Sequence, residues 1–433
     1  MSRGNAFLRS APIVACWMAS STWGCGGGGG SRTPGATGGA SSGVSGGAGG
    51  PAANAGGQAA AAGGQAAAAG GQAAGTAGQA AAAGTGGQAA AAGAAGAPAI
   101  TVANCDSLGP VGKWERLAPT NLKTGPTAFV VDPVNHGTVY LGTGDACVAP
   151  NCDGVFKSTD CGATWAHVNT GRNAAALNGG TQWTFEIDKD DPQILYTNSG
   201  YGTLGLYKSS NGGVDWDDIT PKGDGAAGFV SRTQMDPADS KHILMDWHAD
   251  CTGANPGCFA ETKDGGASWV EHTDPAWAAQ PNVYLLNTLT WVISSNGLFR
   301  TTDGGKTWAK LPGDIVAGGH SAGRLYRAKD QAYYIGTPFG IIRSTWASNG
   351  GEWALLPMSG AWVFGITGDG VSMYAGGQGG FMQSAETDGL AWTSMPDSAH
   401  HADGCSANVD PDPKHNLVYA SCGTDGFWRA RVR

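Results

Sequence analysis

The sequence predicts an all-β protein built from repeated units of four short strands. One observation is a recurring eight-residue pattern with Ser or Thr first, Asp or Asn third, Gly fifth and Trp eighth. It occurs at 158–165, 209–216, 262–269 and 301–308. The other is that short segments of alternating apolar and polar residues, bounded by Gly, Pro, Asn and Asp, precede each copy. A repeat of this kind indicates an array of similar supersecondary units.

Each copy reads as a tight turn followed by a new strand. An Asp side chain can accept a hydrogen bond from its own backbone two residues on, and Gly supplies the positive φ that a turn needs. The Trp that follows is expected to pack between neighbouring sheets. The predicted structural residues are Asp160, Trp165, Asn211, Trp216, Asp264, Trp269, Asp303 and Trp308.

These segments are similar to the Asp-box, or BNR, repeat of sialidase-like β-propellers, and the resemblance covers 113–433. It implies a β-propeller in which the Asp boxes lie on the face opposite the active site. Similar repeats occur in sialidases, xyloglucanases, sortilin-type receptors and photosystem assembly factors. The resemblance therefore implies a fold more strongly than an activity.

Seven units can be counted. The first runs over 129–168, and the next three start near Trp183, Phe229 and Tyr284. Degenerate fifth and sixth units have strands at 323–329, 331–337 and 340–346, and at 363–367 and 373–376. The last has strands at 406–410, 417–421 and 427–432 but no fourth, which 112–117 would supply. We therefore predict a seven-bladed propeller whose last blade is completed by this N-terminal strand, with six blades as the alternative if the fifth unit is an insertion. The corresponding tryptophans are Trp114, Trp165, Trp216, Trp269, Trp308, Trp353 and Trp392.

The chain before the repeats has a different character. Residues 1–25 look like an export signal, with Arg3 and Arg9 before an apolar run at 11–23. Cys25 follows Gly24 in a context that resembles a bacterial lipoprotein cleavage site, which implies lipidation and membrane anchoring at Cys25. Plain cleavage and secretion is the alternative. Residues 26–100 consist largely of Gly, Ala, Ser and Gln and are expected to form a flexible tether, leaving 101–433 as the folded domain.

Charge and composition argue against some classes of partner and location. The formal net charge is −9 and only 14% of the residues are charged, which argues against nucleic acid as a partner. No segment resembles a transmembrane helix of about 20 apolar residues. We expect an exported monomer without a cofactor, in the cell envelope or outside the cell.

Strand order assigns loops to faces. With the strands of a blade named a to d from the inside, the b–c loops and d–a connections share one face, called the top, and the a–b and c–d turns share the bottom. Cys147–Cys152 and Cys251–Cys258 would pin top loops of blades one and three. Cys405 would oppose Cys422 if Asp410 pairs with Leu417. Cys105 and Cys161 both fall at the bottom, on adjacent blades, and are expected to pair.

The top collects polar and aromatic residues at the starts of inner strands. A concave mouth lined by such groups is the usual place for a ligand, and Trp rings beside carboxylates suit sugars. The predicted substrate-binding residues are Trp183, Arg232, His248, His320, Arg324, Trp362, His400 and His401.

The first functional hypothesis is glycoside hydrolysis of a polysaccharide. It needs two carboxylates, about 5–5.5 Å apart for retention or 6.5–9.5 Å for inversion. The candidates are Asp145, Asp250 and Asp403. The segment 140–145 looks similar to the strand of xyloglucanases that ends in a catalytic Asp. Two departures are the cysteine loop at 147–152 and the single propeller, because those enzymes use two.

Three other hypotheses remain open. The chain could be a non-catalytic propeller that binds a glycan or a protein. A sialidase could draw on Arg172, Arg232 and Arg324, although the Phe/Tyr-Arg-Ile-Pro motif of that family is absent. A metal site could use imidazoles at 248, 320, 400 and 401, although no His-Glu-x-x-His spacing supports it.

Overall fold

The computed structural model describes residues 104–433 except 118, 120, 121, 123, 145–151, 223–227, 314, 316–322, 357–361, 399–407 and 423–425. The predicted signal, Cys25 and the tether lie outside the described residues. Over the part that is described, no helix has both the length and the apolar character needed to span a membrane.

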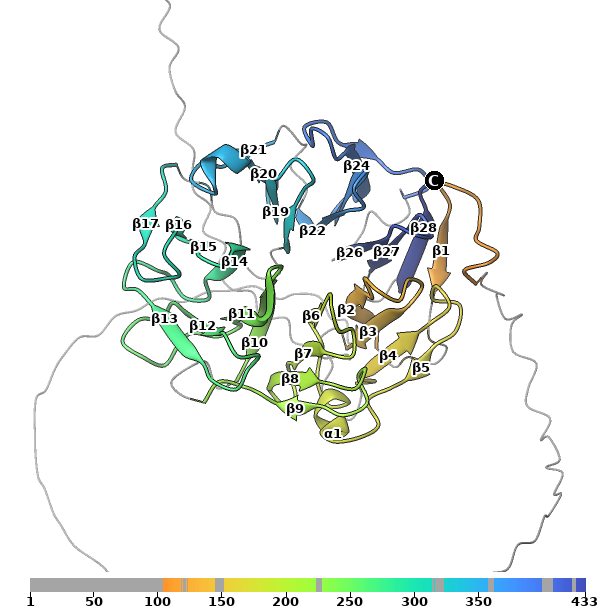
Figure 1. Ribbon diagram of the computed structural model, residues 1–433, viewed down its shortest axis with the longest axis horizontal. Helices are drawn as coiled ribbons and strands as arrows, with labels where there is room; N and C mark the ends of the chain where they lie inside the picture. The colour runs from red at the N-terminus through yellow and green to blue at the C-terminus, as the bar shows by residue number, and fades with distance from the viewer. Residues whose placement is uncertain are drawn as a thin grey trace, which may run out of the picture. The chain divides into compact units, whose positions relative to one another are not determined.

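Seven antiparallel sheets of four strands are arranged as a ring, a seven-bladed β-propeller (Figure 1). The predicted fold class is therefore confirmed, and the fifth unit is a complete blade rather than an insertion. Blade 1 consists of β2 (Pro126–Val131), β3 (Val139–Thr143), β4 (Val155–Ser158) and β5 (Ala166–His167), and blade 2 of β6 (Phe185–Ile187), β7 (Leu195–Ser199), β8 (Gly205–Ser209) and β9 (Asp217–Asp218). Blade 3 consists of β10 (Val230–Asp236), β11 (Asp239–Trp247), β12 (Cys258–Thr262) and β13 (Val270–Thr273), and blade 4 of β14 (Asn282–Asn287), β15 (Thr290–Ser295), β16 (Gly297–Thr301) and β17 (Ala309–Lys310). Blade 5 consists of β18 (Leu325–Arg327), β19 (Tyr333–Thr337), β20 (Gly340–Ser344) and β21 (Ala354–Leu355), blade 6 of β22 (Val363–Gly368), β23 (Ser372–Gly377), β24 (Gly380–Ala385) and β25 (Thr393–Ser394), and blade 7 of β26 (Val409–Asp412), β27 (Leu417–Ser421), β28 (Phe427–Arg431) and β1 (Trp114–Leu117). A short helix, α1 (Ala174–Leu177), lies between blades 1 and 2, and a 3-10 turn, Trp346–Ser348, lies between β20 and β21.

The ring is closed by the N-terminal strand, as predicted. β1 pairs antiparallel with β28, with Trp114 opposite Ala430 and Leu117 opposite Phe427. In Figure 1 the C-terminus lies beside these two strands. The indole of Trp114 also stacks on Phe381 of blade 6 at 4.3 Å between ring centroids. Closure places the last blade between blades 6 and 1 and leaves no free edge there.

The four predicted repeat turns share one hydrogen-bond pattern. In the fourth, Asp303 Oδ1 accepts from the backbone N–H of Lys306 and Thr307 at 3.1 and 3.0 Å, and Thr301 Oγ1 accepts from Gly305 N at 3.0 Å. Equivalent bonds anchor Asp160, Asn211 and Asp264. The three carboxylates and the amide oxygen of Asn211 therefore accept hydrogen bonds within the turn itself.

A second series of acidic or amide side chains organises the a–b turns. In all seven blades an Asp or Asn accepts the backbone N–H two residues further on, which fixes the turn. The residues are Asp132, Asp188, Asp236, Asn287, Asp330, Asp369 and Asp412. Both series lie at the bottom, so their side chains are committed to turns on that face.

The seam between blades 7 and 1 is held by charge as well as by strand pairing. Arg429 of β28 is 1% exposed, and its Nε donates to Glu115 Oε2 at 2.8 Å while Nη1 donates to the Cys161 carbonyl at 2.6 Å. Val131 N donates to Asp410 Oδ2 at 2.8 Å across the same boundary. A disulfide joins Cys105 to Cys161, the pairing expected from the sequence.

The other predicted disulfides are described in part. Cys251 and Cys258 form the expected bond at the ends of the b–c loop of blade 3. Cys152 and Cys422 are also disulfide-bonded, and their predicted partners, Cys147 and Cys405, lie outside the described residues.

The expected strand register of blade 7 is wrong by two residues. Asp412, not Asp410, lies opposite Leu417, and β26 starts at Val409 rather than at 406. The reason is the turn: Asp412 caps it through the N–H groups of Lys414 and His415, so the strand runs on to Asp412. Asp410 is thereby placed within the inner strand.

We expect the ring to require β1. A chain starting at Asn104 should unfold at the temperature of the full chain, because it keeps β1. A chain starting at Pro119 loses the β28 pairing and the Trp114 stack. Removing a buried Trp alone typically costs about 3–5 kcal/mol. We therefore expect the shorter chain to aggregate, or to melt more than about 10 °C lower.

Thermal unfolding followed by circular dichroism measures this. The double variant Cys105→Ser/Cys161→Ser in the longer chain separates the loss of the disulfide from the loss of the strand. Equal melting temperatures for the two chains would contradict the role of β1.

Candidate functional site

Four aromatic side chains meet at the top, between blades 2 and 3. Trp183 stacks on His248 at 4.7 Å between centroids and 25° between planes, and Phe229 lies 4.5 Å from the same imidazole. Tyr201 meets Trp183 edge-on at 5.0 Å. Trp183, Phe229 and His248 are half-buried and Tyr201 is 38% exposed. We call these four residues the aromatic patch.

Local backbone contacts place the patch. Asn198 Oδ1 accepts from the N–H of Trp183 at 2.7 Å, and the Phe229 carbonyl accepts from the N–H of His248 at 2.7 Å. A Cβ at Gly200 would lie 2.9 Å from the Trp183 ring, so the ring needs Gly at that position. Trp183 and His248 were predicted, whereas Tyr201 and Phe229 were not. The sequence could have identified these two residues, because each is an aromatic residue in a top connection of these two blades.

Of the three candidate catalytic acids, the structure describes Asp250. It is exposed on the b–c loop of blade 3, and Gln280 Nε2 donates to its Oδ1 at 3.2 Å. The Cys251–Cys258 disulfide restrains the loop directly after it. Asp145 and Asp403 lie outside the described residues, as do the predicted ligand-binding residues His320, His400 and His401.

Arg232, predicted to bind substrate, is held in a buried ion pair. Its Nη2 lies 3.0 Å from Asp246 Oδ2, only 11% of its side chain is exposed, and Nη1 donates to the Gly323 carbonyl at 3.2 Å. Its guanidinium also lies over the Tyr284 ring at 5.7 Å. Trp362 stacks on Phe364 at 5.2 Å.

Arg324 reaches from the start of blade 5 to blade 2. Its Nη2 donates to the Phe185 carbonyl and lies 3.8 Å from Glu186 Oε1 on β6. Burial raises the pKa of Glu186, against the opposing charge of Arg324. Burial likewise raises the pKa of Asp410 to about 6, although Val131 N–H and Arg324 favour its ionised form. Arg324, Glu186 and Asp410 form what we call the axial cluster, with members from blades 5, 2 and 7.

Sequence reasoning missed both acids of the axial cluster. Each acid is a charged residue within an inner strand, and this unusual position could have identified it from the sequence. Acids with raised pKa values are frequent in catalytic sites. Here Arg324 and the Val131 N–H also give them a structural role between blades.

A second titratable network lies inside blade 3. His242 Nδ1 is 2.9 Å from Asp236 Oδ2, its Nε2 is 3.0 Å from Glu261 Oε1, and Glu261 Oε2 is 3.0 Å from His272 Nε2. Burial by itself would lower the pKa of His242, but hydrogen bonds to Asp236 and Glu261 raise it to about 9. Burial likewise opposes ionisation of Glu261, while its bonds from His242, His272 and Lys263 lower its pKa well below the usual range.

No protein-family model matches this chain. Among curated proteins, it is 26% identical to a xyloglucanase of Paenibacillus over 249 residues, which are 56% of this chain and 21% of that protein. It is also 26% identical to a xyloglucanase of Hypocrea jecorina over 267 residues, 58% of this chain and 28% of that protein. The chain thus spans about a fifth to just over a quarter of the length of these relatives.

Solved structures share the fold. An ancestral GH74 enzyme matches 72% of this chain and 47% of its own with a TM-score of 0.50 and 14% identity. YCF48 bound to D1 peptide matches 74% and 97% with a TM-score of 0.51 and 16% identity. Virginiamycin B lyase from Staphylococcus aureus matches 73% and 98% with a TM-score of 0.52 and 16% identity. The class that the fold defines is the seven-bladed propeller, and within it the chain is similar in sequence to xyloglucanases.

We expect the stability of the domain to fall as pH rises through the His242 titration. The pKa of His242 is raised above the ordinary value of 6.5, so its contribution is complete below pH 6.5 and is lost as pH rises through about 9. The loss amounts to about 3 kcal/mol at most. Denaturant unfolding of the wild type between pH 6.5 and 9.5 should show it.

His242→Gln should flatten this pH dependence and lower stability at pH 6.5, because two buried carboxylates then lose their cation. His167→Gln is the control, since His167 is exposed and bonds Asn178. A pH dependence that is unchanged in His242→Gln would refute the assignment.

Proposed function

We propose that this protein is a carbohydrate-active propeller that binds a polysaccharide across its top face and hydrolyses it. The observation that carries the proposal is the aromatic patch. Its partly exposed rings, with Trp183 placed by Asn198 and accommodated by Gly200, offer flat apolar surface for the faces of sugar rings. The similarity to xyloglucanases supports a plant-type polysaccharide such as xyloglucan as the first ligand to test.

Loop lengths favour an extended ligand. The b–c connections of blades 4, 5 and 6 contain one or two residues, between Ser295 and Gly297, Thr337 and Gly340, and Gly377 and Gly380. Those of blades 1 and 3 span 144–154 and 248–257. A polymer that extends from the patch over blades 4 to 6 would meet short b–c connections there.

Hydrolysis would use acids of the top loops. We propose Asp145, Asp250 and Asp403 as the candidates, with two of them flanking the glycosidic bond as acid and as base or nucleophile. Trp362, His320, His400 and His401 are proposed as further ligand contacts. Glu186 and Asp410 of the axial cluster are candidates that the structure adds, because burial keeps their carboxyls easier to protonate.

The alternative is a propeller that binds a glycan or a protein without turnover. The exposure of Asp250 favours it, since a general acid is usually buried enough for its pKa to rise. In either case we propose an exported protein, secreted or anchored at the envelope through a lipidated Cys25, acting as a monomer.

Replacing Trp183 should weaken polysaccharide binding. Trp183→Ala removes the central ring of the patch and should lower affinity for xyloglucan about tenfold or more, without lowering the melting temperature greatly. Affinity electrophoresis in gels containing the polysaccharide measures this. Trp346→Ala is the control, since Trp346 is 49% exposed in a bottom turn. If both variants bind as the wild type does, the patch is not the ligand site.

Replacing a catalytic acid should separate turnover from binding. Asp145→Asn or Asp250→Asn should lower the hydrolysis rate at least 10³-fold while affinity stays within about threefold, because the charge acts in the transition state. Reducing-end release from xyloglucan and other polysaccharides gives the rate. Asp190→Asn, an exposed acid of a bottom turn, is the control. Binding without product in the wild type would support the non-catalytic alternative instead.

A further inference from the structure

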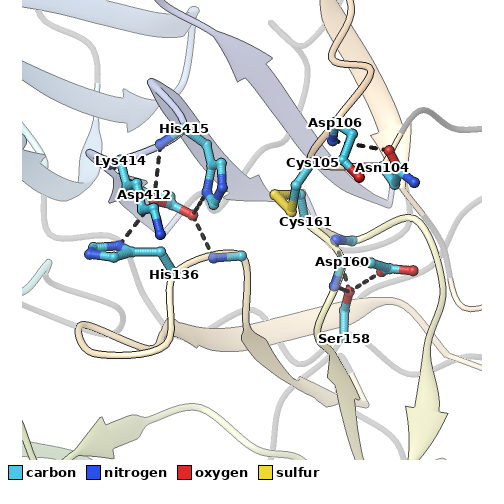
Figure 2. The surroundings of a disulfide bond; sticks show 12 residues. Asn104, Cys105, Asp106, His136, Ser158, Asp160, Cys161, Asp412, Lys414 and His415 are labelled. Atoms are coloured by element: carbon cyan, nitrogen blue, oxygen red, sulfur yellow. Dashed lines mark hydrogen bonds and ion pairs between the residues drawn. A yellow bond between two sulfur atoms is a disulfide. The ribbon is translucent and has the colours of Figure 1, made fainter.

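The bottom end of the seam brings two cysteines and a histidine together (Figure 2). One ligand atom from each of Cys105, Cys161 and His415 lies within 4.8 Å of the others. Cys161 is buried, and Cys105 and His415 are half-buried. They come from three separate stretches: the segment before β1, the c–d turn of blade 1 and the a–b turn of blade 7. Only closure of the ring assembles them.

Asp412 orients the imidazole. Its Oδ2 lies 2.7 Å from His415 Nδ1, and its side chain is fully buried. Asp412 Oδ2 also accepts from Gly137 N at 2.7 Å, and Oδ1 lies 3.2 Å from His136 Nδ1. Because a carboxylate accepts the proton of Nδ1–H, His415 carries its free lone pair on Nε2. Metal-binding histidines are typically held in this way by a carboxylate on the other ring nitrogen.

Gly137 faces the same three groups. Its φ is +84°, and a Cβ built there would lie 2.8 Å from Cys105 Sγ, 3.3 Å from Cys161 Sγ and 3.5 Å from His415 Cε1. A side chain at this position would clash with Cys105 Sγ, so any other residue would force a shift of the disulfide or of the turn. The glycine therefore lets the backbone of the a–b turn of blade 1 approach the two sulfurs and the imidazole closely.

We propose that, once the Cys105–Cys161 disulfide is reduced, this group binds a zinc-type divalent ion through both sulfurs and His415 Nε2, with solvent completing the tetrahedron. Two electrons from a phosphine or dithiol reductant break the S–S bond and give two thiols. Binding of the ion releases their two protons and leaves two thiolates. Zn–S bonds of about 2.3 Å place tetrahedral sulfurs roughly 3.7 Å apart, which small side-chain rotations provide.

The site would keep the seam joined in either redox state. Oxidised, the covalent bond links the segment before β1 to blade 1. Reduced, the ion would link the same two points and add blade 7 through His415. The Cys251–Cys258 pair offers a contrast, because among the described residues only the seam group meets the geometry of a three-ligand metal site.

The test uses the full chain with Co²⁺ as the probe, because thiolate ligation gives it an intense near-ultraviolet charge-transfer band. We expect the phosphine-reduced wild type to develop this band with one tightly bound ion and the oxidised protein not to. Cys105→Ser/Cys161→Ser should abolish it, and His415→Gln should weaken affinity at least tenfold. Cys251→Ser/Cys258→Ser, the matched control, should retain it.

Melting temperatures of the oxidised variants show whether His415→Gln still folds. A reduced wild type without the band, or one that unfolds and is not refolded by Zn²⁺, would overturn the proposal. So would a band of equal strength in Cys105→Ser/Cys161→Ser, which would place the ion on other cysteines. If a folded His415→Gln variant kept full affinity for the ion, the imidazole of His415 would not be one of its ligands.

Discussion

The pairing of β1 with β28 is the interaction on which the rest of the structure depends. Six blades take all four strands from consecutive chain, whereas the seventh takes its outer strand from the start of the domain. Ring closure is therefore a long-range event in sequence, with Trp114 opposite Ala430. Its entropic cost is offset in part by the polar contacts that Arg429 and Asp410 make at this boundary. Arg429 is 1% exposed, and Glu115 and the Cys161 carbonyl accept hydrogen bonds from its buried guanidinium.

Turn chemistry divides the two faces. At the bottom, the repeat turns and the a–b turns occupy their Asp and Asn side chains with backbone N–H groups. Ser268 and Thr307 lower the pKa values of Asp264 and Asp303 to about 2, so these acids are fixed as anions. A general acid cannot be drawn from such groups. Among the described top connections, Asp153 and Asp274 likewise accept backbone N–H groups, whereas Asp250 accepts from the side chain of Gln280.

The sequence repeats allowed the fold to be predicted, but they did not predict which side chains meet inside the ring. Seven tryptophans at comparable positions gave the number of blades, and the missing strand of the last blade identified β1. Periodicity says little about partners across the ring, however. Arg324 meets Glu186 three blades away, and Arg232 is paired with Asp246 on its own blade. The register of blade 7 was misjudged because the capping residue is Asp412, the second of two acids separated by Pro411.

Similar propellers carry different activities, as the GH74 enzyme, the peptide-bound YCF48 and the virginiamycin B lyase show. The fold therefore cannot choose among them, and the choice must rest on side chains. The aromatic patch joins two blades through rings that pack on one another rather than on the core, and Tyr201 keeps 38% of its surface exposed. Exposing such rings costs free energy unless a ligand covers them. The apolar C–H faces of sugar rings, in the polysaccharide that we propose as the ligand, would cover such rings.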